Sequence, residues 1–192
     1  MIHRVFIALN LPEKIKKELI NLNKKWPEFK NSIKWVKKEN LHLTLIFLGI
    51  LNEKEVLILR EVVKKILQNQ KSFILKTEKI CYGPPKTIPP RLVWLEVEKK
   101  SNLLKLVENL QKNLVETKIL KKIEQRKFSP HITIGRIKTW QWQRIEPEER
   151  PNIEEKFISE FEVNSLQLME SKLKRTGVQY TLIEEIPFLD QV

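Results

Sequence analysis

The chain has 192 residues, of which 41% are hydrophobic and 31% are charged, so it can bury a core and is too apolar to be disordered. Its formal charge of +12 favours a polyanionic partner, nucleic acid above all, although a lysine-rich solvated surface explains the charge equally well. The single cysteine excludes an intrachain disulfide and a cysteine-based zinc cage. No apolar run reaches the ~20 residues of a membrane span, so a cytoplasmic protein without membrane attachment is expected.

The first half of the chain alternates strands and helices. Its predicted elements are a strand over 4–10, a helix from 13 that Pro27 ends, a strand over 41–48 closed by Gly49, a helix opened by Asn52 and Glu55, and a strand over 72–80. A proline-rich loop over 82–90 then separates this half from the second.

The second half repeats the order of the first. Its predicted elements are a strand over 91–97, a helix opened by Ser101, a strand over 129–135 and two last strands over 161–171 and 178–186 with a turn at Gly177. Residues 139–156 receive no assignment. Alternating strands and helices indicate an α/β or α+β protein, and the repetition suggests two similar lobes about an approximate two-fold axis.

Each half carries one histidine in an apolar strand, with a threonine two residues later. His42 and Thr44 share one face of the first strand, opposite Leu43, and His131 and Thr133 do the same in the second. Strict alternation puts residues 47 and 136 on the core faces. Two copies in matching contexts, in a chain with three histidines, favour a functional pair over two satisfied core histidines. His3 lacks this context and is interpreted as structural.

Acid–base catalysis on a phosphate fits this pattern better than its alternatives. Two histidines without a fitting carboxylate or thiolate nearby make a poor metal site, and no serine lies in a nucleophile-elbow pattern. One neutral imidazole can accept a proton while one protonated imidazole donates another, and an ordinary pKa of about 6.5 permits both near neutral pH. The two threonine hydroxyls can hydrogen-bond a phosphate held between the rings.

These residues and their flanks resemble the two-histidine (2H) phosphoesterase superfamily, and within it the bacterial and archaeal 2′-5′ RNA ligase / RNA 2′,3′-cyclic phosphodiesterase family. The matching segments cover nearly the whole chain in order: RVFIALNLP, IKWVKKENLHLTLIFLG, RLVWLEV, FSPHITIGR and LMESKLKRTGVQYTLIEEIPF. The chain departs from the family at Ile46, where a basic residue is frequent, and at Ser129, where arginine is frequent.

The resemblance implies an α+β fold that is bilobal, with two pseudo-symmetric α/β lobes whose antiparallel sheets flank a central cleft. Residues 1–192 would form a single domain with lobes of about 1–82 and 91–192, their terminal strands exchanged. It implies that His42 and His131 are catalytic and need no metal or cofactor. The phosphate-binding residues that it implies are Thr44, Thr133 and Arg136, with Arg136 needing a twist near Gly135 or a long reach. Phe47 matches an aromatic position near the nucleotide, with a core position as the alternative.

The function that the resemblance implies is hydrolysis of a terminal RNA 2′,3′-cyclic phosphate to a 2′-phosphate. Run in reverse with an RNA 5′-hydroxyl, the same site would act as a 2′-5′ RNA ligase. The expected partner is RNA with cyclic-phosphate or 2′-5′ linked ends, tRNA fragments among them, bound by a monomer. Two alternatives remain open: a phosphodiesterase of a small cyclic phosphate, and a non-catalytic RNA-binding module.

Overall fold

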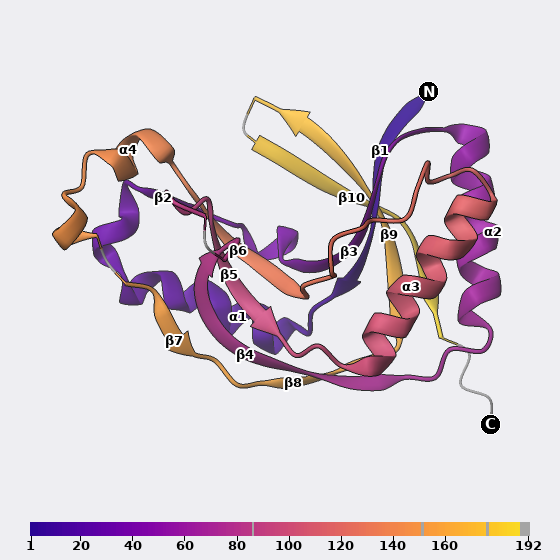
Figure 1. Ribbon diagram of the computed structural model, residues 1–192, viewed down its shortest axis with the longest axis horizontal. Coiled ribbons are helices and arrows are strands. Elements are labelled where there is room, and N and C mark those ends of the chain that lie inside the picture. Colours follow the sequence, from indigo (N-terminus) through magenta and orange to yellow (C-terminus); the bar gives the residue numbers. More distant parts are fainter. Residues whose placement is uncertain (86, 151, 176, 189–192) are drawn as a thin grey trace.

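The computed structural model describes residues 1–85, 87–150, 152–175 and 177–188, and strands dominate it (Figure 1). The strands are β1 (Ile2–Asn10), β2 (Ile33–Trp35), β3 (His42–Asn52), β4 (Phe73–Gly83), β5 (Leu92–Val97), β6 (His131–Ile137), β7 (Glu154–Lys156), β8 (Glu160–Val163), β9 (Ser165–Lys174) and β10 (Gly177–Pro187). The helices are α1 (Glu13–Leu22), α2 (Glu53–Leu67), α3 (Ser101–Glu116) and α4 (Thr139–Gln143), with 3₁₀ turns η1 (Asn23–Lys25), η2 (Pro27–Lys30), η3 (Lys38–Asn40) and η4 (Pro147–Glu149).

One antiparallel sheet runs through the molecule in the order β10-β9-β1-β3-β6-β5-β4-β7, with β2 added beside β6 and β8 beside β4. The two halves of the sequence meet at its centre, where β3 and β6 pair through Leu43 and Ile132. The last strands of the chain, β9 and β10, join the first, since β9 pairs with β1. The predicted α+β class with antiparallel sheets is confirmed. The division into two lobes stays a prediction.

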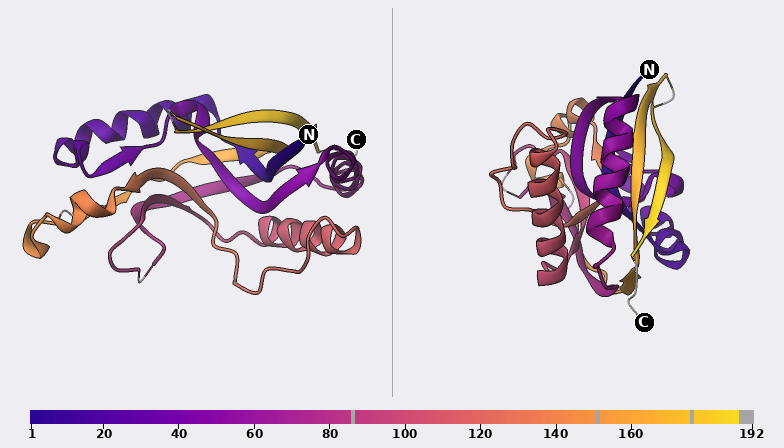
Figure 2. Two further views of the ribbon diagram at one scale, coloured as in Figure 1. Left: turned by 90° about the horizontal axis from the view of Figure 1, so that it is seen from above. Right: turned by 90° about the vertical axis from the view of Figure 1, so that its right-hand side faces the viewer.

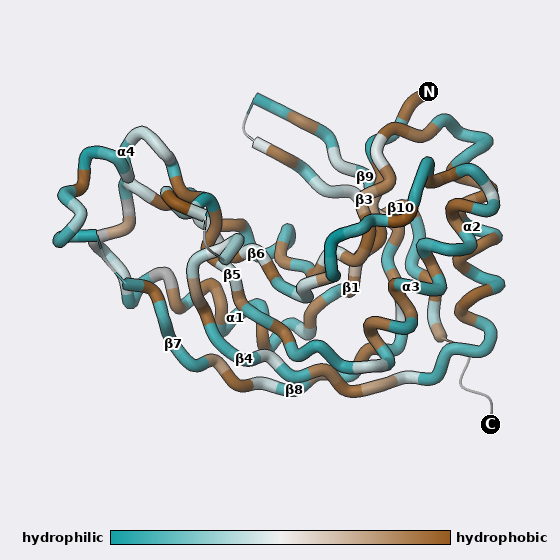
Figure 3. The backbone as a smooth tube through the Cα atoms, in the orientation of Figure 1, coloured by the Kyte–Doolittle hydropathy of each residue, from teal (hydrophilic) through white to brown (hydrophobic). Residues whose placement is uncertain are grey.

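Helices α2 and α3 lie side by side at one end of the molecule, and α4 lies at the other end (Figures 1 and 2). Each long helix is amphipathic, which Figure 3 shows as alternating brown and teal bands. The predicted start of α2 is confirmed: Asn52 Oδ1 accepts a hydrogen bond from the Glu55 amide (3.1 Å), and the Glu55 carboxylate accepts one from the Asn52 amide (2.7 Å). No helix in the described ranges is long and apolar enough to cross a bilayer.

The strand predicted over 41–48 does not end at Gly49 as expected, since β3 continues to Asn52. Gly49 has φ +80°, and it pairs with Val5 while the next residue, Phe6, pairs with Phe47. Leu48 therefore lies in a β-bulge, which bends a strand without ending it. A glycine with positive φ can mark such a bulge as well as a turn, and local sequence does not distinguish the two.

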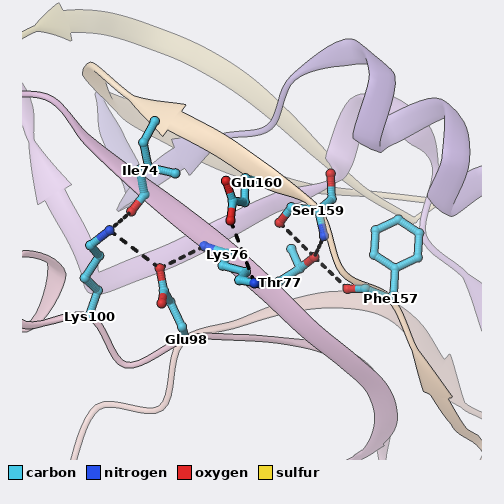
Figure 4. A network of polar contacts seen from close by, with 8 residues as sticks. All are labelled: Ile74, Lys76, Thr77, Glu98, Lys100, Phe157, Ser159 and Glu160. Carbon is cyan, nitrogen blue, oxygen red and sulfur yellow. Dashed lines mark hydrogen bonds and ion pairs between the residues drawn. The ribbon is translucent and has the colours of Figure 1, made fainter.

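Strand β4 changes partner along its length, and buried Thr77 holds the point of change (Figure 4). Its first half pairs with β8 and its second half with β7. Between these two ladders the Thr77 hydroxyl donates to the Phe157 carbonyl (2.7 Å) and accepts from the Ser159 amide (2.9 Å). The hydroxyl thus satisfies backbone groups that the interrupted ladder leaves unpaired.

Candidate active site

The two histidine motifs lie side by side in the central strands β3 and β6. Continuing the antiparallel register of Leu43 and Ile132 by one residue each way puts His42 opposite Thr133 and Thr44 opposite His131. Directly opposite residues have Cβ atoms about 4.5–5.5 Å apart and diagonal neighbours lie at about 7–8 Å. The two imidazoles occupy a diagonal, with a threonine at each remaining corner. Their ring-to-ring distance stays a prediction of about 5–8 Å between nitrogens, as a bound phosphate requires.

The face on which these side chains lie follows from the neighbouring strand β5. His131, Thr133 and Arg136 pair with Glu96, Trp94 and Leu92, which alternate regularly along β5 and therefore share a face. The extra residue on β6 is Ile134, left in a bulge between the pairs of Thr133 and Gly135. Arg136 is therefore exposed on the catalytic face, as the anticipated twist near Gly135 requires.

A matching bulge corrects the face expected for Phe47. On β1, Ala8 pairs with Thr44 and Ile7 with Ile46, which leaves Leu45 as the extra residue. Phe47 therefore turns to the face of His42 and is 74% exposed, whereas the alternation rule put it in the core. Ile46 is buried on the other face.

The two bulges fall at the same place in each motif, two to four residues after the histidine. The sequence patterns are thus equivalent in space: His, Thr two residues on, and a third exposed side chain five residues on. In β3 that third side chain is Phe47, and in β6 it is Arg136. One motif therefore adds an aromatic ring beside the imidazoles, and the other adds a cation.

Backbone carbonyls fix the orientation of both imidazoles. His42 Nδ1 lies 2.8 Å from the Asn40 carbonyl, and His131 Nδ1 lies 2.8 Å from the Ser129 carbonyl. A carbonyl oxygen only accepts, so Nδ1 carries the proton and donates in each ring. Among the residues that the structure describes, Nε2 is left as the ring nitrogen without a backbone partner. In His42, Nε2 lies 2.9 Å from the Thr44 hydroxyl, which donates to it when the ring is neutral.

His131 lies on an indole platform. Its ring stacks on Trp94 with centroids 3.8 Å apart and planes at 19°. The far side of the indole rests on Gly83 of β4, where an added Cβ would be 2.2 Å from Trp94 Cδ2. Glu96 follows on the same face of β5, opposite His131. The position of His131 thus depends on two further strands.

His42 has a different, aromatic surrounding. Its ring centroid is 5.0 Å from that of Phe6 on β1 and 5.0 Å from that of Tyr180 on β10, with the Tyr180 ring perpendicular. The ring of Phe47 is 6.0 Å from that of Phe6. The strands that hold His42 in place therefore come from both ends of the chain.

Burial lowers the pKa of both histidines below the ordinary value, and the nearby charges differ. For His42, burial is the largest cause, the Asn40 carbonyl opposes it, and the positive charges of Lys16 and Arg136 lower the pKa further. For His131, burial again dominates, while the Ser129 carbonyl and the Glu96 carboxylate raise the pKa. The charges thus favour the neutral form of His42 and the protonated form of His131.

The remaining histidine, His3, pairs with an acidic side chain, since its Nδ1 lies 2.8 Å from Glu170 Oε1, and its structural role stays a prediction. Within the described residues, no group of three or more histidine, cysteine or acidic side chains is arranged to hold a metal ion.

The sequence reasoning missed the residues that surround the two imidazoles. They are Phe6, Lys16, Trp94, Glu96 and Tyr180. Each comes from an element distant in sequence from the motif that it supports. A period-two pattern places Trp94 and Glu96 on one face of a strand, but the residues around them in sequence do not indicate that His131 packs on this face.

Comparisons with known proteins agree with this architecture. A family model described as the 2′-5′ RNA ligase superfamily matches residues 17–175. A Thermotoga maritima protein named RNA 2′,3′-cyclic phosphodiesterase is 32% identical over 188 residues, which covers 96% of this chain and 95% of that protein. A Methanocaldococcus jannaschii protein of the same name is 30% identical over 183 residues, with coverages of 95% and 99%.

Solved structures give the same result for the fold. A crystal structure of a Thermus thermophilus protein has a TM-score of 0.83 at 27% identity and covers 98% of this chain and 100% of its own. Escherichia coli LigT complexed with 3′-AMP has a TM-score of 0.77 at 23% identity, with coverages of 99% and 100%, and is similar in fold.

Proposed function

Because the chain belongs to the 2′-5′ RNA ligase superfamily, we propose that it is a hydrolase that opens 2′,3′-cyclic phosphates at RNA ends. Relatives named RNA 2′,3′-cyclic phosphodiesterase, 30–32% identical over nearly the full chain, support this activity. The observation that carries it is that a backbone carbonyl binds Nδ1 of each ring, which leaves Nε2, on the Thr44 hydroxyl in His42, as the nitrogen for proton transfer.

The proposed reaction uses the two imidazoles in opposite protonation states. A neutral histidine takes a proton from water as the water oxygen bonds to phosphorus, and a protonated histidine gives its proton to the 3′-oxygen as that bond breaks. A 2′-phosphate and a free 3′-hydroxyl remain, and one proton transfer between the rings through solvent restores the site. The charges around the rings favour His42 as the base and His131 as the acid.

The other proposed site residues bind rather than transfer protons. Thr44 and Thr133 lie at the free corners between the imidazoles, where their hydroxyls can donate to phosphate oxygens, that of Thr44 by turning from His42 Nε2 to the phosphate. Arg136 adds a permanent positive charge on the same face. Phe47 offers an exposed ring on which the terminal base can stack.

The reverse reaction uses the same groups. With an RNA 5′-hydroxyl in place of water, attack on the cyclic phosphate gives a 2′-5′ linkage with no nucleotide cofactor. We propose RNA carrying such ends, tRNA fragments among them, as the partner, and a cytoplasmic monomer as the working form. Residues 1–192 are proposed to form one domain with lobes of about 1–82 and 91–192. The pairing of C-terminal β9 with β1 supports an exchange of terminal strands between them.

The test is a product analysis. An RNA oligonucleotide ending in a 2′,3′-cyclic phosphate, incubated with the protein, should yield a 2′-phosphate and no 3′-phosphate, distinguishable by chromatography against synthetic standards. The alternative of a small-molecule phosphodiesterase predicts faster turnover of a cyclic mononucleotide than of the oligonucleotide. The alternative of an RNA-binding module predicts binding without turnover. Either of these outcomes would overturn the proposal.

A further inference from the structure

Two exposed cations are directly paired beside the histidine motifs. Lys34 of β2 and Arg136 of β6 are directly opposite in an antiparallel pairing, and both are exposed. Like charges at such positions destabilise a sheet. Among the described residues, neither belongs to an ion pair, although thirteen ion pairs form elsewhere. An anion between the two would remove this repulsion.

Both cations lie on the face of the histidines, with Lys34 farther than Arg136 from the reacting phosphate. Arg136 shares its face with His131 and Thr133, and Lys34 shares the face of Arg136 as its direct partner. Strands β2 and β3 pair with the same edge of β6, at Arg136 and at Ile132 respectively. Because Ile134 is bulged, Ile132 and Arg136 are three strand steps apart, or about 10 Å, so Lys34 stands beyond a phosphate held between the imidazoles. An anion at Lys34 is therefore a second, separate group.

The β9–β10 hairpin adds an apolar surface near Lys34. The Lys34 ammonium reaches its turn, where it lies 3.3 Å from the position of a Cβ at Gly177. Leu173 (84% exposed) and Val178 (38% exposed) are directly paired, and Val178 shares its face with Tyr180, which contacts His42. Figure 3 shows hydrophobic (brown) and hydrophilic (teal) residues alternating along the outer part of this hairpin. Such an exposed aliphatic face beside a cation offers apolar contact to a nucleobase next to its phosphate.

We propose that Lys34, Arg136 and the outer face of the β9–β10 hairpin form a subsite for the nucleotide that precedes the cyclic phosphate. The phosphodiester that links the last two nucleotides lies between Lys34 and Arg136, and the preceding base lies on Leu173 and Val178. Arg136 then stands between the two phosphates. This inference rests on the proposed function and adds to it a physical basis for preferring an RNA chain over a cyclic mononucleotide.

The test compares kcat/KM for three substrates: a cyclic mononucleotide, a dinucleotide ending in the same cyclic phosphate, and that dinucleotide with an uncharged methylphosphonate linkage. The wild-type protein should prefer the charged dinucleotide, and the methylphosphonate should cost it about tenfold, the scale of one charged phosphate contact. The Lys34→Ala variant should have a dinucleotide-to-mononucleotide ratio of kcat/KM about tenfold lower than the wild type. Its kcat/KM should be the same for the charged and the methylphosphonate dinucleotides. Leu173→Ser should lower the ratio about threefold.

The matched control is Lys105→Ala, which removes the same charge from an exposed position on α3 and should leave the ratio unchanged. Turnover of neither cyclic phosphate by the wild-type protein would refute the proposed function itself. Equal kcat/KM for the mononucleotide and the charged dinucleotide would overturn the subsite alone. A full methylphosphonate penalty in Lys34→Ala would do the same, and so would an equal loss on all substrates.

Discussion

At the scale of single residues, the arrangement of proton-transfer groups depends on two backbone carbonyls. The carbonyls of Asn40 and Ser129 bind Nδ1 of His42 and His131, so Nε2 is the ring nitrogen left for the proposed proton transfers. Each carbonyl belongs to the residue two positions before its histidine. The chain segment that carries each ring therefore also sets its tautomer.

Replacing His42 or His131 by alanine should lower turnover of a cyclic-phosphate RNA end by about 10²–10⁴-fold, the usual contribution of one positioned acid or base. The unfolding midpoint should change little, because both rings lie at the surface of the sheet and are only partly buried. His3→Ala is the control, since His3 pairs with Glu170, and it should retain activity. Turnover should also persist in EDTA. Full activity in His42→Ala, or inactivation by EDTA, would contradict the acid–base mechanism.

Glu96→Gln tests the electrostatic difference between the two rings. The carboxylate raises the pKa of His131, so its removal should lower that pKa further. The pKa of His42 should change less, because Glu96 acts on it only through the charge of His131. Histidine resonances followed by NMR over a pH titration measure both values. An unchanged pKa of His131 in this variant would show that the carboxylate does not act on the ring.

At the scale of elements, the active site is assembled by strands that supply no catalytic residue. Strand β5 places Trp94 beneath His131, and β4 leaves room for the indole through Gly83. Strand β10 contributes Tyr180 beside His42. The bulges in β3 and β6 then turn the residues that follow each motif onto the catalytic face.

Gly83→Ala should displace the indole, because its Cβ would be 2.2 Å from Trp94 Cδ2 and both residues are buried in the sheet. The expected cost is about 1–3 kcal/mol of unfolding free energy from overpacking, and kcat/KM should fall by about tenfold or more as His131 shifts with its platform. Urea unfolding and steady-state kinetics below the transition temperature measure the two effects separately. Normal kinetics in a destabilised variant would limit the platform to a structural role.

Thr77→Val should destabilise the fold at the point where β4 changes partner. The valine has a similar shape but leaves the Phe157 carbonyl and the Ser159 amide without the hydroxyl, at a cost of about 1–3 kcal/mol for buried groups. Thr181→Val, at an exposed position of β10, should stay within about 0.5 kcal/mol of the wild type. Urea denaturation compares them, and equal stability of the two variants would argue against the role of the Thr77 hydroxyl.

At the scale of the whole molecule, the lowered histidine pKa values link stability to pH. A ring whose pKa is lower in the folded state than in the unfolded chain binds a proton more readily after unfolding. The free energy of unfolding should therefore be highest above about pH 7 and fall as the pH drops below about 6.5, the unfolded value, through the lowered folded values. Urea unfolding between about pH 7.5 and pH 5 measures this slope.

The control for this dependence is the double variant His42→Gln and His131→Gln, which should lose most of the slope in that range. The pKa values of Glu170 and Glu184 are also lowered in the folded state. Protonation of these carboxylates lowers the free energy of unfolding only below about pH 4.5, which is outside the measured range. Stability of the wild type that rises on acidification across the same range would contradict the assigned directions.

The amino-acid sequence by itself determined the features that depend on local spacing. Apolar periodicity predicted most strands and helices, the Asn52 and Glu55 pair marked a helix start, and the two His-x-Thr motifs identified the residues that the structure brings together in adjacent strands. These signals are carried by residues within a few positions of one another, so one chain segment contains all of each.

Only the tertiary structure decided which side chains surround those motifs. The bulges at Leu45 and Ile134, which turn Phe47 and Arg136 toward the histidines, exist only in register with β1 and β5. The platform of Trp94, the ring of Tyr180 and the opposition of Lys34 to Arg136 likewise join segments far apart in sequence. A bulge or a cross-strand contact is a property of two paired strands, so the alternation of residues along one strand does not predict it.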